Sequence, residues 1–117
     1  MKSVLVVDDN AVNRKLAVAL LKRRSFNAQE ASGGQQALDM LQASHFDVVL
    51  LDISMPLMDG KEVCRIIRSQ PALSHVRVIA YTAHAMASER QSIMAAGFDD
   101  LLVKPISIQD LQRVMPD

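Results

Sequence analysis

Five polar residues come directly after short apolar runs in this chain. Asp8 and Asp9 follow one run, Asp52 follows a second, and Thr82 and Lys104 follow two more. A short run of aliphatic residues is typical of a strand that is buried on both faces, in which a charge fits only at the end. Because the carboxyl ends of parallel strands meet at one edge of a sheet, we expect these five side chains to converge on one pocket.

The expected pocket has the composition of a site for a hard cation and a phosphoryl group. Carboxylates about 4 Å apart repel each other by roughly 4 kcal/mol per pair at an effective dielectric constant near 20. Such a cluster raises carboxyl pKa values or recruits a cation, and oxygen ligands favour Mg²⁺ or its substitute Mn²⁺. A lysine and a hydroxyl would complete an electrostatic clamp for phosphate, and one carboxylate could act as a nucleophile.

Each of these residues also has a structural interpretation of its own. Asp8 and Asp9 could cap the helix that follows them, and Asp52 could be a turn residue. Thr82 could be an ordinary residue at a strand end, and Lys104 could be an exposed loop cation. Their joint occurrence at four strand ends favours the shared pocket over these separate explanations.

Strand and helix patterns alternate five times along the chain. The expected strands cover residues 2–8, 27–31, 46–52, 76–82 and 100–103, and a helix pattern follows each of them. This alternation predicts an α/β fold with parallel strands and helices on both faces of the sheet. We expect a flavodoxin-like five-stranded sheet in the order 2-1-3-4-5, partly because that order brings Asp8 beside Asp52.

Local signals predict how two of the helices begin and which way the first one faces. Asn10 is expected to cap the first helix, and the residues expected on its core face are Val12, Leu16, Ala19 and Leu20. The segment Ser32-Gly-Gly-Gln35 matches a capping box and is expected to open the second helix.

Composition limits the class of protein. The 117 residues are expected to form a single domain, and the formal net charge of zero gives no sign of a nucleic-acid partner. The single cysteine, Cys64, excludes an internal disulfide and is expected to be a packing residue. No apolar segment reaches the length of a membrane span, so we expect a cytoplasmic protein.

Four segments together resemble the response-regulator receiver domain of two-component signalling, in the CheY-like superfamily. They are VLVVDDN, VVLLDISMPLMDG, VIAYTA and LLVKPI, and the resemblance extends over nearly all of residues 1–117. It implies that Asp52 accepts a phosphoryl group from a phosphohistidine, while Thr82 and Lys104 contact the phosphoryl oxygens. It also implies a phosphoacceptor switch rather than an enzyme, and a cis Lys104–Pro105 bond.

The same resemblance implies a magnesium site and protein partners. Mg²⁺ would be held directly by Asp9, Asp52 and the backbone carbonyl of Ser54, while Asp8 would act mainly through water. The phosphodonor would be a histidine kinase or a histidine phosphotransfer protein, which in this family docks on the first helix. A downstream effector would dock on the face formed by the fourth helix, the fifth strand and the fifth helix.

The sequence departs from the family pattern at one informative position. Three residues before Lys104 the family usually has a tyrosine or phenylalanine, whose ring moves with the threonine, and here that residue is Leu101. We therefore expect weaker coupling between phosphorylation and the output face, or coupling through the backbone of the fourth helix. Ser54 and His84 occupy positions at which family members tune the lifetime of the phosphoryl group.

Two other functions share part of this pattern. A phosphatase of the haloacid-dehalogenase type also uses a strand-end aspartate and Mg²⁺, but it normally has a second aspartate where this chain has Ser54. A constitutive interaction module could keep the fold without phosphorylation, although the intact pocket argues against it.

Overall fold

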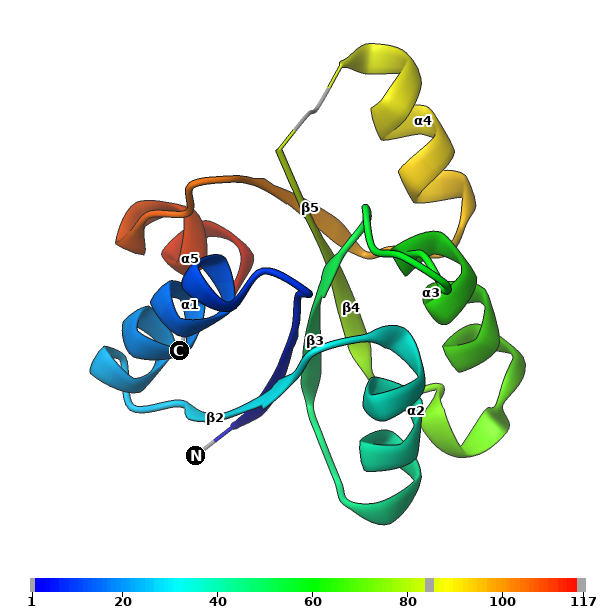
Figure 1. The fold of residues 1–117 in the computed structure, drawn as a ribbon, viewed down its shortest axis with the longest axis horizontal. Helices are drawn as coiled ribbons and strands as arrows, with labels where there is room; N and C mark the ends of the chain where they lie inside the picture. Colours follow the sequence, from blue (N-terminus) through cyan, green and yellow to red (C-terminus); the bar gives the residue numbers. More distant parts are fainter. Residues whose placement is uncertain (1, 84–85, 116–117) are drawn as a thin grey trace.

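Five parallel strands form one sheet in the order β2-β1-β3-β4-β5, as the sequence predicts (Figure 1). The computed structural model describes residues 2–83 and 86–115. The strands are β1 (Ser3–Val7), β2 (Asn27–Ala31), β3 (Val48–Asp52), β4 (Arg77–Thr82) and β5 (Asp100–Val103). The helices are α1 (Ala11–Arg23), α2 (Gly34–Ala43), α3 (Gly60–Ser69), α4 (Ala87–Ala95) and α5 (Ile108–Val114), with a short 3₁₀ turn at Pro71–Leu73.

Helices cover both faces of the sheet, so the protein has two separate apolar cores. Helices α1 and α5 pack on one face, and helices α2, α3 and α4 pack on the other (Figure 1). Strand β3 is buried along its whole length, because side chains on both of its faces meet helices. Cys64 lies inside the core on the α3 side, as expected, and burial raises the pKa of its thiol to about 11.

The register of the strands brings their carboxyl ends to one level. Val7 pairs with Leu51 across β1 and β3, Asp52 pairs with Tyr81 across β3 and β4, and Thr82 pairs with Val103 across β4 and β5. The residues that follow or end these strands are therefore placed at the same edge of the sheet.

Helix α1 presents a different face to the core from the one that the sequence predicts. Ala17 and Leu21 are buried, whereas Val12 is 77% exposed and Leu16 is 41% exposed. The helix carries two adjacent apolar stripes, and periodicity alone cannot choose between them. The stripe that contains Val12, Leu16 and Ala19 faces solvent, and Leu20 is half-buried at its border with the core.

The start of helix α2 is also corrected by the structure. Gly33 is the N-cap and has no side chain to cap the helix, so Ser32 lies one residue before the cap. The Gln36 side chain, rather than that of Gln35, turns back and accepts hydrogen bonds from the backbone N–H (2.8 Å) and hydroxyl (3.0 Å) of Ser32. Asn10 caps α1 as predicted, with its side chain accepting from the backbone N–H of Asn13.

Candidate functional site

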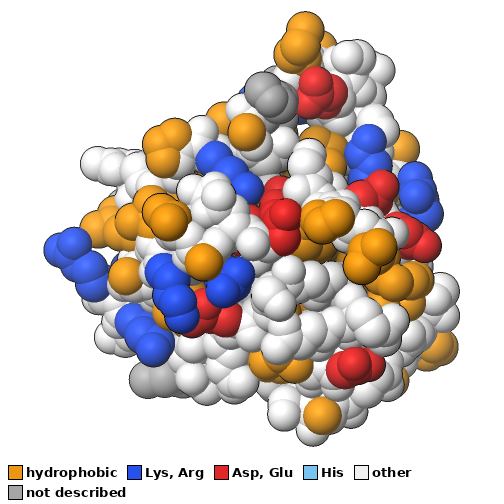
Figure 2. Space-filling view, viewed as in Figure 1, with side chains coloured by type: hydrophobic (Ala, Val, Ile, Leu, Met, Phe, Trp, Pro, Cys, Tyr) orange, Lys and Arg blue, Asp and Glu red, His pale blue; other side chains and the backbone are white. Residues whose placement is uncertain are grey.

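Three carboxylates meet at the carboxyl edge of the sheet. Asp8, Asp9 and Asp52 each offer an oxygen, and these oxygens all lie within 4.8 Å of one another. Asp8 and Asp52 are buried, whereas Asp9 is exposed. Figure 2 shows acidic side chains near the middle of the molecular face, with a basic side chain beside them. The pocket expected from the strand ends is therefore formed in the folded chain.

The chemistry of this cluster fits a hard divalent cation. Every side chain in it supplies a carboxylate oxygen, which is the donor type that Mg²⁺ prefers. Among the described residues, Asp8 Oδ2 is a buried oxygen that accepts no well-directed hydrogen bond, although the Lys104 ammonium lies 3.0 Å away. A buried carboxylate oxygen with spare acceptor capacity beside two more carboxylates is suited to a cation or to an ordered water on a cation.

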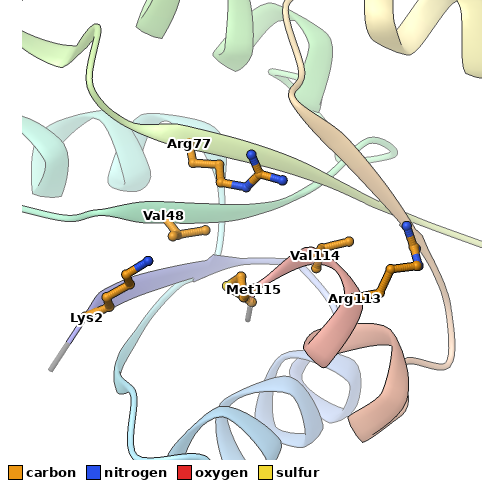
Figure 3. Close-up of a pocket in the computed structure, with 6 residues that line it drawn as sticks. All are labelled: Lys2, Val48, Arg77, Arg113, Val114 and Met115. Atoms are coloured by element: carbon orange, nitrogen blue, oxygen red, sulfur yellow. The ribbon is translucent and has the colours of Figure 1, made fainter. Parts of the chain in front are cut away.

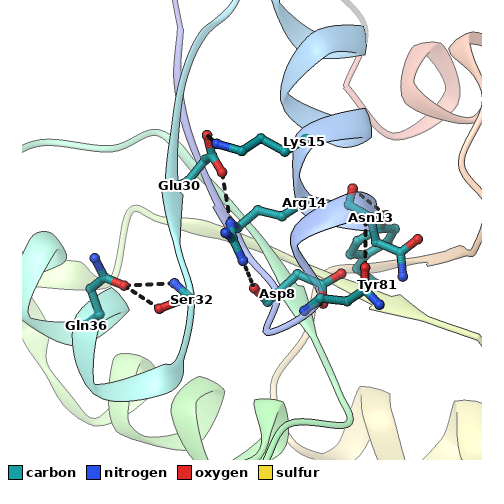
Figure 4. Close-up of polar contacts among 9 residues, drawn as sticks. Asp8, Asn13, Arg14, Lys15, Glu30, Ser32, Gln36 and Tyr81 are labelled. Atoms are coloured by element: carbon teal, nitrogen blue, oxygen red, sulfur yellow. Dashed lines mark hydrogen bonds and ion pairs between the residues drawn. The ribbon is translucent and has the colours of Figure 1, made fainter.

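Asp8 is held in place by hydrogen bonds with strand β2 and with the start of helix α1. Its backbone N–H donates to the carbonyl of Ala31 in β2 (3.2 Å), and its Oδ1 accepts from the backbone N–H of Asn10 (2.8 Å). Arg14 Nη1 donates to the Asp8 carbonyl (2.8 Å) while Arg14 Nε donates to Glu30 (2.8 Å), as Figure 4 shows. These bonds fix the backbone that carries the acidic pair.

Asp52 ends strand β3 in an environment that disfavours its charge. The pKa of its carboxyl is raised to about 6, first because burial removes water and next because Asp8 is close. Lys104 and a hydrogen bond from the backbone N–H of Ser54 (3.2 Å) act in the opposite direction. A cation or a second ammonium group near Asp52 would therefore favour its ionised, nucleophilic form.

Gly60 makes room for the backbone that carries Asp52. A Cβ atom at this position would lie 2.2 Å from the Asp52 carbonyl oxygen and 2.9 Å from Ile53 Cα, so any side chain would displace the end of β3. The backbone N–H of Gly60 also donates to the carbonyl of Ile53 (3.0 Å). The turn from β3 into α3 thus depends on a close approach of two backbone segments.

Lys104 reaches into the acidic pocket from the end of β5. Its Nζ lies 3.0 Å from Asp8 Oδ2 and 3.4 Å from Asp52 Oδ1, and its side chain is only 13% exposed. Its backbone N–H donates to the carbonyl of Thr82 (2.8 Å), which joins the ends of β4 and β5. The Lys104–Pro105 peptide is cis, as the resemblance implies. The side chain of Thr82 is buried at the same edge.

The sequence pattern that describes response regulator receiver domains matches residues 4–115 of this chain. The chain belongs to this family. The family assignment removes the dehalogenase-type alternative.

The receiver domain is similar to proteins of very different length. It is 39% identical over 113 residues to the signal transduction histidine-protein kinase BarA of Escherichia coli, covering 97% of this chain and 12% of BarA. It is 36% identical over 107 residues to the polar-differentiation response regulator DivK of Brucella suis, covering 92% of this chain and 87% of DivK. The chain thus spans a small part of one relative and most of the other.

Two solved structures have the same fold. The chemotaxis protein CheY4 of Vibrio cholerae has a TM-score of 0.91 and 29% identity, with 97% of this chain and 95% of CheY4 covered. The receiver domain of the sensor histidine kinase PA1611 of Pseudomonas aeruginosa has a TM-score of 0.88 and 33% identity, with 97% and 93% covered. That structure holds a magnesium ion in its active-site cleft.

Leu101 lies on the opposite face of the sheet from α1. It is buried in the core shared with α2, α3 and α4, and it is paired with Ala80 across β4 and β5. The receiver domain therefore has no ring at this point of the fold, as the sequence indicates. His84, the other position singled out near Thr82, lies outside the described residues.

Two residues that contact the site were not singled out from the sequence. In the sequence, Arg14 is one of several charged residues of α1. The one signal that could have linked it to Asp8 is its position about one helical turn after the acidic pair. Tyr81 reads as an apolar residue of β4, yet Lys104 Nζ lies 4.6 Å from the centre of its ring. Burial and the nearby charges of Asp8 and Asp52 raise the pKa of Tyr81 to about 12, so its hydroxyl remains a donor.

A second hollow lies at the other edge of the sheet, where the strands begin. Figure 3 shows basic and apolar side chains that line it, from β3, β4 and α5 and from the residues next to β1 and α5, namely Lys2, Val48, Arg77, Arg113, Val114 and Met115. Arg77 and Arg113 are both paired with Asp100, at 3.4 and 3.5 Å. None of the acidic pocket's residues line this hollow. Among the described residues, none of the helices is both long and apolar enough to cross a membrane.

Proposed function

We propose that this receiver domain, residues 1–117, accepts a phosphoryl group on Asp52 from the phosphohistidine of a histidine kinase or a histidine phosphotransfer protein. The observation that carries the proposal is the position of the Asp52 carboxylate, which lies buried at a strand end among two other carboxylates and the Lys104 ammonium. The receiver would act as a cytoplasmic signalling switch and not as a multiple-turnover enzyme, apart from slow loss of its own phosphoryl group.

The proposed metal ligands are Asp9, Asp52 and the backbone carbonyl of Ser54, with Asp8 acting through water. When bound, Mg²⁺, or Mn²⁺ in its place, neutralises charge on the phosphoryl oxygens and favours the ionised carboxylate. Asn10 and Arg14 keep Asp8 turned toward this position through the bonds to its Oδ1 and its carbonyl. Ser54 orients the nucleophile, because its N–H donates to Oδ1 of Asp52.

In the proposed transfer, an oxygen of Asp52 forms a bond to phosphorus while the bond between phosphorus and the donor imidazole nitrogen breaks. The electron pair of the broken bond stays on the imidazole, and Asp52 becomes an acyl phosphate. Lys104 and Thr82 would contact the oxygens of the transferred group. The transferred phosphoryl group carries a charge of about −1.5 to −2, which replaces the single charge of the ionised Asp52. It would draw the Lys104 ammonium away from Asp8, to which it is paired in the unphosphorylated chain.

Two exposed apolar surfaces support the proposed partners. The stripe of α1 that contains Val12 and Leu16 stands close in sequence to the acidic pair, and we assign it to the phosphodonor. Met94 on α4 and Val103 at the end of β5 are also exposed, on the face proposed for a downstream effector. Phosphorylation would change this second face by moving Thr82 and Lys104.

Labelling with a small phosphodonor tests the proposal. Incubation with acetyl phosphate and Mg²⁺ is expected to add one phosphoryl group, seen by intact-mass spectrometry, and removal of Mg²⁺ by chelation should prevent it. Asp52→Asn should abolish labelling, whereas Asp39→Asn, at an exposed aspartate on α2, should not change it. Full labelling of the Asp52→Asn variant would contradict the assignment of the phosphoacceptor.

A further inference from the structure

Tyr81 connects Lys104 to helix α1. Its side chain is completely buried, and Lys104 Nζ lies 4.6 Å from its ring centre. At the other end of the ring, the Tyr81 hydroxyl donates to the backbone carbonyl of Asn13 (3.3 Å), as Figure 4 shows. The side chain of Tyr81 therefore contacts both the Lys104 ammonium group and the first turn of α1.

The alternation of side chains along β4 places this ring opposite Leu101. Tyr81 belongs to the core shared with α1 and α5, whereas Ala80 and Leu101 belong to the core on the other face of the sheet. The ring therefore cannot enter space near α4. A displacement that Lys104 imposes on the ring acts on the core shared with α1 and α5, and the hydroxyl bond carries it to Asn13.

An aromatic face is a suitable support for an ammonium group that has to move. The Lys104 ammonium contacts two carboxylates and one ring, and the ring attracts the cation without forming a directional ion pair. The ring also shields the ammonium from water, because Tyr81 is completely buried and Lys104 nearly so. The ring thus fixes the position of the Lys104 ammonium group in the pocket, and the ammonium group remains free to turn toward a new anion.

We propose that Tyr81 is a positioning residue for Lys104 and transmits the displacement of Lys104 to α1. The transmission rests on the proposed function, because it requires an anion at Asp52. The positioning does not, because it concerns the unphosphorylated chain. In this receiver domain, occupation of the pocket would therefore be sensed on the α1 side of the sheet, through the residue that precedes Thr82.

Lys104 resonances in the free protein test the positioning. The ring is expected to shift the ε-methylene protons of Lys104 upfield, and Tyr81→Leu should abolish this shift while Tyr81→Phe should keep it. Phe46→Leu is the matched control, since Phe46 is equally buried but lies before β3, at the other edge of the sheet. An unchanged Lys104 shift in Tyr81→Leu, or an equal loss in Phe46→Leu, would overturn the proposal.

Beryllium fluoride with Mg²⁺, a stable mimic of the phosphoryl group, tests the transmission. Its binding should change the amide shifts of Asn13 and Arg14 in the wild type. In Tyr81→Phe, which lacks only the hydroxyl, these changes should become smaller while those at Asp52 remain, because Asn10 and Arg14 still connect Asp8 to α1. Changes in α1 of wild-type size would overturn the transmission. Tyr81→Leu should bind the mimic about tenfold more weakly, a loss equivalent to about 1.4 kcal/mol. Failure of the wild type to bind it would contradict the proposed function, while the Lys104 shift would still decide the positioning.

Discussion

The ammonium group of Lys104 lies 3.0 Å from Oδ2 of Asp8. A divalent cation that enters the cluster would therefore meet an ammonium group already in contact with two of its three carboxylates. We predict that Lys104→Met strengthens Mg²⁺ binding to the unphosphorylated protein by at least tenfold, because a positive charge about 4 Å away raises the free energy of a bound cation by several kcal/mol at an effective dielectric constant near 20. Titration calorimetry measures the effect. Lys22→Met, at an exposed lysine in the last turn of α1, is the control. Equal or weaker binding in Lys104→Met would contradict the prediction.

Asp52 should make the stability of the metal-free protein depend on pH. Its pKa is raised from 3.8 to about 6 in the folded chain, so the folded state binds the proton more tightly than the unfolded state does. The wild type should lose stability relative to Asp52→Asn as the pH rises through this interval. The difference should reach about 3 kcal/mol at neutral pH, from 1.36 kcal/mol per unit of pKa. Urea denaturation at a series of pH values measures it.

Asp47 provides a control of opposite sign for that experiment. A hydrogen bond from the backbone N–H of Ser3, and then one from His45, lower the pKa of the Asp47 carboxyl. Its contribution to stability is therefore present above the unfolded pKa and lost as the pH falls through the folded value. Asp47→Asn should be less stable than the wild type at neutral pH, with the gap closing in acid. For Asp52, a difference in the free energy of unfolding between wild type and Asp52→Asn that stays constant from pH 4 to 7 would show that folding does not raise the pKa of Asp52.

Gly60→Ala should damage both the fold and the site. The new methyl group would lie 2.2 Å from the Asp52 carbonyl oxygen, and neither backbone segment can move without disturbing β3. We expect a loss of about 1–3 kcal/mol in the free energy of unfolding, typical of overpacking, together with loss of Mg²⁺-dependent phosphorylation. Gly33→Ala is the matched control, because a Cβ there meets nothing within 4 Å. Equal effects of the two variants would argue against the close approach at Gly60.

Arg14→Met should weaken Mg²⁺ binding at the proposed metal site without altering any of the proposed ligands. The substitution removes the donor to the Asp8 carbonyl, which costs about 1–3 kcal/mol when a partly buried acceptor is left without a partner. The loosened loop should bind Mg²⁺ several-fold more weakly. Lys15→Met is the control, because Lys15 pairs with the same Glu30 but is 67% exposed and makes no contact with Asp8. Matching Mg²⁺ affinities in the two variants would refute a positioning role.

Leu16→Glu should separate docking from chemistry. Leu16 is exposed on α1, so a charge there should spare the fold but disrupt an apolar contact with a phosphodonor protein. We expect much slower phosphotransfer from a phosphohistidine protein and unchanged labelling by acetyl phosphate. Leu57→Glu, at a fully exposed leucine after β3, is the control. Normal transfer to Leu16→Glu would remove α1 from the docking surface.

The ends of the strands could be predicted from the sequence because burial and charge exclude each other. A run such as Val48 to Leu51 can be buried on both faces only if the charge of Asp52 comes at its very end, so the site residues and the sheet edge could be predicted together. The order of the strands followed from the same reasoning.

The inward face of α1 could not be predicted because the helix is apolar on two adjacent stripes. Ala17 and Leu21 face the core. Val12 and Leu16 have the same four-residue spacing but lie on the adjacent stripe of the helix, which faces solvent. The roles of Arg14 and Tyr81 depend on contacts between segments distant in the chain, such as the Tyr81 hydroxyl with Asn13. Composition and periodicity carry no information on such contacts.

The first turns of α1 limit how this receiver could be given a new partner. Asn13 and Arg14 are tied to Tyr81 and Asp8, while Val12 and Leu16, interleaved with them, face outward. Replacement of the whole helix by one from another protein would change the inward-tied and the outward-facing residues together. It would therefore disturb the segment that carries Asp8 and Asp9. Exchange of the outward-facing residues alone, with Asn13 and Arg14 retained, should change which phosphodonor protein is recognised and leave the acidic pocket intact.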